Sequence, residues 1–201
     1  YIHYNKGSLV LYAISDYIGE KNFNNFLKEY IKRVAFQEAP YTTAIEFVDL
    51  LKTHVPDSLQ YLVKDMFETI TLYDNSVQSV TSKKLPNGKY QVDITFNISK
   101  YRAADNGVRL FEDIKGTALS YGEGDKKIQS LPLADYIEIA VFGDPKGEDL
   151  YAMDNEVFLK KYKIDKINNK ISIVVDQKPY EVGVDPYNKL IDTNSNDNRK
   201  K

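Results

Sequence analysis

The chain has 201 residues, of which 42% are hydrophobic, and its 27 basic and 29 acidic side chains leave a formal net charge of −2. This balance provides no global positive field, so the composition argues against a nucleic-acid partner. The absence of cysteine excludes disulfides, thiolate metal sites and cysteine nucleophiles. No apolar run approaches the roughly 20 residues of a membrane span, which predicts a soluble piece. Because the chain starts abruptly and without methionine, we expect it to be part of a longer protein.

Apolar side chains at helical spacing predict two helices near the start of the chain. The first stripe runs from Leu9 to Ile18, and Gly19 follows it where a helix C-cap belongs. The second stripe runs from Phe23 to Val34 and stops before the break at Ala39-Pro40.

Two further helices are expected between residues 43 and 70. Thr43 and Glu46 have the spacing of a capping box ahead of the third helix. Asp57 or Ser58 is the expected cap of a fourth helix, whose apolar stripe reaches Ile70. Four short amphipathic helices would form a small helical layer.

After Asp74-Asn75 the apolar residues alternate with polar ones, which predicts β-strands. Pro86-Asn87-Gly88 is a turn signal, and the alternation from Tyr90 to Ile98 indicates a hairpin with one buried face. The glycine and aspartate content of Tyr101–Gly124 indicates a long loop that could contain one strand. Further strands are expected at Lys126–Leu131, Tyr136–Phe142, Val157–Ile164, Lys170–Val175 and Tyr180–Val184.

These patterns together predict an α+β protein. Residues 1–75 form the helical part, and the short strands of residues 76–191 indicate an antiparallel β-sandwich. Residues 192–201 are polar throughout and are predicted to be a disordered tail.

The sequence lacks the common motifs of zinc sites, serine hydrolases and phosphate-binding loops. His3 and His54 are far apart and no His-Glu-x-x-His pair lies between them, so surface or helix-end roles are favoured for both. No serine occupies a Gly-x-Ser-x-Gly elbow, and no glycine-rich loop ends in Lys-Ser/Thr to hold phosphate.

The tail imitates a calcium loop only in part. Asp192, Asn194 and Asn196 have the spacing of the first EF-hand ligands. Asp197 stands where the sharp turn needs glycine, and no glutamate follows at the bidentate position. We therefore predict no metal site and no cofactor site in this chain.

One short motif points to a known family. Tyr4-Asn5-Lys6-Gly7, followed by Ser8-Leu9-Val10-Leu11, resembles the Tyr-x-Lys-Gly-x-x-hydrophobic motif of the aminopeptidase N family of gluzincin zinc metallopeptidases, peptidase family M-one. Pro56–Asn75 and Val182–Asp192 resemble the end of the catalytic domain and the C-terminal segment of a bacterial branch of that family. In that branch the peptidase follows a membrane permease of the ATP-binding-cassette exporter type.

The resemblance implies a function for the parent protein and one site residue. The chain would be the end of a thermolysin-like catalytic domain and a following sandwich, from a membrane-associated bacterial protein. Zinc, its ligands and the general base would belong to the upstream part, so this piece alone would be inactive. Tyr4 is the expected catalytic residue, because a tyrosine hydroxyl can donate a hydrogen bond to the oxyanion that forms during peptide hydrolysis. The expected partners are a peptide substrate and the upstream catalytic and permease domains.

Lys6 and Gly7 have simpler interpretations within the same motif. A lysine in the first helical turn is usually solvated, and a glycine there permits close approach of backbones.

Two alternatives remain open at this point. The sandwich could be a non-catalytic binding or scaffolding module that presents Tyr101, Tyr121, Tyr136 or Tyr151 to a carbohydrate or peptide, although such residues more often pack in a core or at an edge. The parent could also be a degenerate peptidase that has lost its zinc ligands and kept a scaffolding role.

Overall fold

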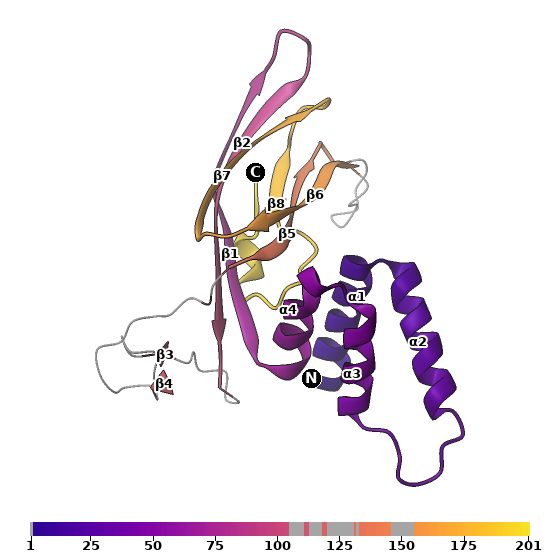
Figure 1. Cartoon of the computed structure of the whole chain (residues 1–201). Helices are drawn as coiled ribbons and strands as arrows, with labels where there is room; N and C mark the ends of the chain where they lie inside the picture. Colours follow the sequence, from indigo (N-terminus) through magenta and orange to yellow (C-terminus); the bar gives the residue numbers. More distant parts are fainter. Residues whose placement is uncertain (1, 105–110, 113–117, 120–130, 132, 146–154) are drawn as a thin grey trace. The chain divides into compact units, whose positions relative to one another are not determined.

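The computed structural model describes residues 2–104, 111–112, 118–119, 131, 133–145 and 155–201 (Figure 1). It confirms an α+β fold, with helices in the first part of the chain and antiparallel sheets in the second. The chain divides into two compact units, Tyr1–Thr71 and Leu72–Lys201, which we call the helical unit and the β unit. The division falls shortly before the predicted boundary at residue 75, because the first strand already begins at Thr71.

The helical unit contains four α-helices and three shorter helical turns. The α-helices are α1 (Gly7–Ile18), α2 (Glu20–Val34), α3 (Ala44–His54) and α4 (Gln60–Val63). A π-helical turn precedes α1 (Ile2–Lys6), a 3₁₀ turn precedes α4 (Asp57–Leu59), and a second π-helical turn follows α4 (Lys64–Glu68).

The predicted end of the first helix and the predicted start of the third are confirmed by the structure. Gly19 separates α1 from α2 with φ of 86°, a conformation that glycine adopts without the steric cost of a Cβ atom. At the start of α3, the Thr43 hydroxyl accepts a hydrogen bond from the Glu46 backbone N–H, and the Glu46 carboxylate accepts one from the Thr43 N–H. This reciprocal pair is the capping box that the sequence predicts.

The fourth helix differs from its prediction. Asp57 and Ser58 lie inside its first turn and no side chain caps its start. The helical turns end at Glu68, so Ile70 is not part of the stripe and is 38% exposed. The Thr69 hydroxyl donates to the Lys64 carbonyl across the last turn, and the following β-branched residues favour the extended conformation of the strand.

The core of the helical unit centres on Phe26, which is fully buried. Its ring meets those of Phe47 at 4.9 Å, Phe23 at 5.8 Å and Tyr30 at 6.5 Å between centroids. Aromatic side chains bury large apolar areas, so this cluster makes a large contribution to the packing of α2 on α3. The other buried apolar residues of the unit are Val10, Ala13, Ile14, Ile18, Leu50, Leu51, Val55, Leu62, Val63 and Met66.

The described part of the β unit contains three sheets. The strands are β1 (Thr71–Lys84), β2 (Tyr90–Arg102), β3 (Phe111–Glu112), β4 (Ala118–Leu119), β5 (Asp135–Phe142), β6 (Glu156–Ile164), β7 (Asn168–Val175), β8 (Glu181–Val184) and β9 (Arg199–Lys200). The first sheet has the order β1-β2-β7, the second has the order β6-β5-β8-β9, and β3 pairs with β4 (Figure 1). The predicted strand at Lys126–Leu131 lies outside the described residues except for Leu131.

Alternation of apolar and polar side chains places the core of the β unit. In the first sheet, β2 and β7 pair antiparallel with Ile94 opposite Ile171, and the apolar positions of β2 from Val92 to Ile98 are fully buried. The predicted hairpin forms between β1 and β2, where Gly88 adopts φ of 85°. In the second sheet, β5 is buried along nearly its whole length because both of its faces are covered.

The prediction of a disordered tail at residues 192–201 is wrong. Thr193 N–H donates to the Tyr73 carbonyl at 3.0 Å, and β9 pairs with β8 through Gly183 and Arg199. The carbonyl of Asn198, a fully buried residue, accepts a hydrogen bond from the Val184 N–H. Polar composition suggested disorder, but strand edges in the β unit satisfy the backbone groups of this segment.

Candidate functional site

Tyr4 lies in the π-helical turn that precedes α1 and is 84% exposed. The Ser8 hydroxyl donates to the Tyr4 carbonyl at 2.5 Å and reaches the Asn5 carbonyl at 3.1 Å. Ser8 therefore binds two backbone acceptors of the widened turn and helps to hold it. The phenol of Tyr4 is therefore exposed beside a held helical turn.

The neighbouring motif residues have mainly backbone roles. Lys6 is half-buried, so it is less solvated than we expected, and it has helical backbone angles at the start of α1. Gly7 is also half-buried as the first residue of α1. The structure thus brings Tyr4, Lys6 and Gly7 together at one helix start, as their spacing requires.

His54, near the end of α3, participates in a contact between helices. Its Nε2 lies 3.0 Å from Glu29 Oε2, and its ring meets the Phe26 ring edge to face at 5.8 Å between centroids. Glu29 also accepts a hydrogen bond from Arg33, which lowers the pKa of the Glu29 carboxyl together with the weaker effect of His54. This arrangement fits the structural role that the sequence favours for His54. The side chain of His3 is not among the described ones.

The described part of the chain contains no group of three His, Cys, Asp or Glu side chains placed to hold a metal ion. At the calcium-like stretch, Asp192 accepts backbone hydrogen bonds from Asn75 at 2.9 Å and from Asn194 at 2.9 Å, one on each carboxylate oxygen. Burial raises the pKa of Asp192. The carboxylate is therefore used in joining the C-terminal segment to β1.

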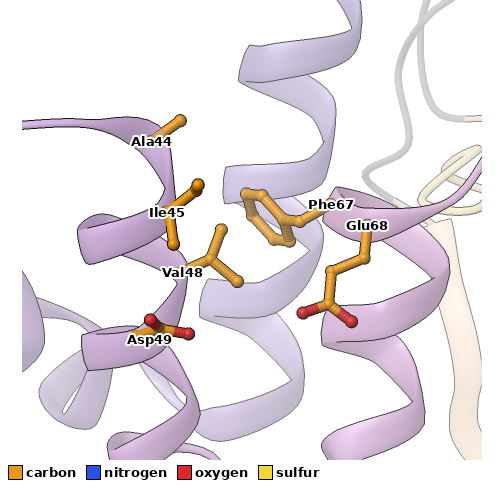
Figure 2. Close-up of a pocket in the computed structure, with 6 residues that line it drawn as sticks. All are labelled: Ala44, Ile45, Val48, Asp49, Phe67 and Glu68. Carbon is orange, nitrogen blue, oxygen red and sulfur yellow. The ribbon is translucent and has the colours of Figure 1, made fainter.

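A small pocket lies between α3 and the π-helical turn after α4 (Figure 2). Its volume is about 240 Å³. The residues that line it are Ala44, Ile45, Val48, Asp49, Phe67 and Glu68. The Lys52 ammonium forms ion pairs with Glu68 and, at 3.8 Å, with Asp49. The pocket has an apolar wall and carboxylates whose charge Lys52 partly offsets, and none of the predicted site residues lies in it.

Of the four tyrosines proposed for a binding face, two lie in the described part of the chain. Tyr101 is only 4% exposed and is part of the core. Tyr136 is half-buried on β5. Tyr121 and Tyr151 lie outside the described residues. Tyr101 is therefore unavailable to a surface partner.

The Val182–Asp192 stretch, which contributed to the family resemblance, has a structural role in the β unit. Asp185 has φ of 44°, and its two carboxylate oxygens accept the backbone N–H groups of Lys189 at 3.0 Å and Leu190 at 2.9 Å. The Lys189 ammonium donates to both oxygens of Glu138 on β5 at 2.8 Å. A Cβ atom on Gly183 would lie 2.7 Å from Pro186 Cβ, so only glycine fits there without a shift. The stretch is a tight turn joined to the sheet by buried charges.

A second buried ion pair connects the two main sheets. The Lys100 ammonium on β2 donates to Asp135 on β5 at 2.9 and 3.0 Å, and the Tyr73 hydroxyl on β1 donates to the same carboxylate at 2.9 Å. Sequence analysis missed both buried ion pairs, because Lys and Glu are mostly exposed in proteins and their partners are distant along the chain. The alternation pattern of β2 and β5 is the only signal that could have indicated them.

A scan against protein-family models and a search of curated proteins each gave no match. Among the described residues, no helix is both long and apolar enough to cross a membrane.

Proposed function

We propose that this chain is the C-terminal part of a zinc-dependent aminopeptidase and that Tyr4 is its oxyanion-stabilising residue. On this proposal, the helical unit is the end of a thermolysin-like catalytic domain, and the two main sheets of the β unit form a supporting β-sandwich. The parent protein is a membrane-associated bacterial peptidase with a permease upstream.

The observation that carries the proposal is the position of Tyr4. The residue belongs to the Tyr-x-Lys-Gly motif, and its side chain is exposed on a π-helical turn immediately before α1. Single π-helical turns are rare and frequently occur at functional sites. A helix start held by Ser8 offers a rigid support from which a phenol can reach a reacting group.

The chemistry assigned to Tyr4 is electrostatic. Zinc, held by residues outside this chain, would polarise the scissile carbonyl and activate water. Tyr4 donates its O–H to the carbonyl oxygen as negative charge develops there. The hydrogen bond strengthens in the transition state, so it affects turnover more than binding.

The test uses the longer polypeptide that carries the zinc site together with this chain, and follows hydrolysis of an aminoacyl chromogenic substrate. Tyr4→Phe should lower kcat by about 10²–10³ and leave zinc content unchanged, because loss of one oxyanion donor has that effect in other enzymes. Tyr12→Phe is the matched control, since Tyr12 is also exposed and lies on α1. Chelator should abolish hydrolysis, and this chain alone should show none.

Two results would count against the proposal. Hydrolysis that persists after removal of zinc would exclude the proposed chemistry. A Tyr4→Phe variant with normal kcat would exclude the role of this residue, even if the parent is a zinc peptidase.

A further inference from the structure

Strand β6 forms one edge of the second sheet. In the described part of the chain it pairs only with β5, antiparallel, from Asp135 opposite Ile164 to Phe142 opposite Glu156. Its nine residues leave a row of backbone donors and acceptors on the outer side. Such an edge can accept another extended chain unless its side chains prevent pairing.

The edge carries a concentration of positive charge. Strand β6 contains the three lysines Lys160, Lys161 and Lys163 and one acidic residue, Glu156, whereas the whole chain has a net charge of −2. Lys160 and Lys163 are exposed on β6, and among the described residues no carboxylate pairs with either of them. Lys161 is different, because its ammonium lies 3.4 Å from Glu138 on β5.

The two exposed lysines of β6 lie on opposite faces of the sheet. Lys160 is opposite Ile139 and Lys163 is opposite Tyr136, and side chains at odd spacing along a strand point to opposite faces. Positive charge therefore borders the open edge from both sides. Leu159 is 37% exposed on the same strand, on the face that carries Lys163, and adds an apolar contact there.

These charges decide between two kinds of occupant. A second copy of the chain paired at this edge would bring the lysines of two β6 strands together, which is unfavourable. An added strand with carboxylates on both of its faces would place them beside Lys160 on one side and beside Lys163 on the other. A strand with carboxylates on a single face would place them beside one of the two lysines. We propose that the outer edge of β6 binds an extended acidic peptide segment by strand addition, with Lys160 and Lys163 pairing with its carboxylates. The proposal does not depend on the peptidase function.

The probe is a synthetic peptide with the repeat Glu-Glu-Thr-Thr, which places carboxylates on both faces of an extended strand, titrated into the full 201-residue chain at low salt. Binding should protect β6 amides from hydrogen exchange and weaken as salt increases. Lys160→Glu/Lys163→Glu should reduce affinity about tenfold or more, since two exposed ion pairs are replaced by repulsion. Lys160→Arg/Lys163→Arg should retain binding. Lys28→Glu/Lys32→Glu on α2 makes the same change in net charge elsewhere and should have little effect.

A second peptide separates strand addition from simple charge attraction. N-methylation of alternate residues, in each of the two registers, removes backbone donors but keeps every carboxylate. At least one of the two methylated peptides should lose binding if backbone hydrogen bonds contribute.

Three results would overturn the proposal. These are undiminished binding of both methylated peptides, equal binding of a peptide with the repeat Lys-Lys-Thr-Thr, and protection that appears away from β6. Preferential binding to phosphatidylserine vesicles would also overturn it, in favour of a membrane surface.

Discussion

Raising the pH from about 4 to about 8 should destabilise the β unit through Asp185. The carboxyl is 2% exposed, and burial raises its pKa from 3.8 to about 7 despite the backbone N–H groups of Leu190 and Lys189, which lower it. Glu138 and Asp192 raise it further. At a pH between these two pKa values, the Asp185 carboxyl is protonated in the folded state and deprotonated in the unfolded state. The stabilising effect is thus complete below about pH 3.8 and is lost as the pH rises to about 7.

The magnitude follows from the difference between the two pKa values. A difference of about 3 corresponds to about 4 kcal/mol, at ~1.4 kcal/mol for each tenfold change in proton affinity. This is a large part of the ~5–15 kcal/mol by which folded domains are usually stable. The effect should therefore be measurable above the contributions of other titrating groups.

Asp185→Asn isolates this contribution. Asparagine tolerates the positive φ of 44° and keeps an acceptor oxygen, but it does not titrate in this range. The free energy of opening of the β unit can be measured from hydrogen exchange of β5 amides at several pH values. The stability of the wild type relative to the variant should fall by about 4 kcal/mol between about pH 4 and pH 8. A difference that stays constant, or that rises with pH, would refute the reasoning.

Three further substitutions test the packing and capping described above. Thr43→Ala removes one half of the capping box and should cost about 1 kcal/mol in urea unfolding followed by helical ellipticity, so an unchanged midpoint would contradict the cap. Phe26→Ala empties the centre of the aromatic cluster and should cost about 3–5 kcal/mol in the same measurement, whereas a loss below about 1 kcal/mol would show that the cluster is not the core. Lys100→Met leaves Asp135 buried without its cation and should cost about 3–5 kcal/mol in β5 hydrogen exchange. Lys100→Met/Asp135→Leu should restore part of that stability, and a double variant less stable than the single one would argue against an ion-pair effect.

Local patterns determined most of the secondary structure of this chain. The Thr43 and Glu46 capping box, the Gly19 helix end and the β1–β2 turn at Gly88 are all present, because each depends on residues within a few positions of one another. The candidate site at Tyr4 depends on the resemblance of a short local motif to a known family. Its motif occupies consecutive residues, so the structure adds the π-helical turn and the exposure of the side chain rather than the identity of the residue.

The features that sequence analysis missed depend on contacts between distant residues. Residues 192–201 are polar enough to predict disorder, but their order comes from hydrogen bonds to Tyr73 and Val184. The pairing of Lys189 with Glu138, and the position of β6 at an open edge, likewise exist only after the sheets assemble. Sequence alone determined the identity of most helices, strands and turns, since those depend on local backbone energetics. Tertiary structure alone decided which charges are buried and which edge is open, because burial and strand order are properties of the assembled chain.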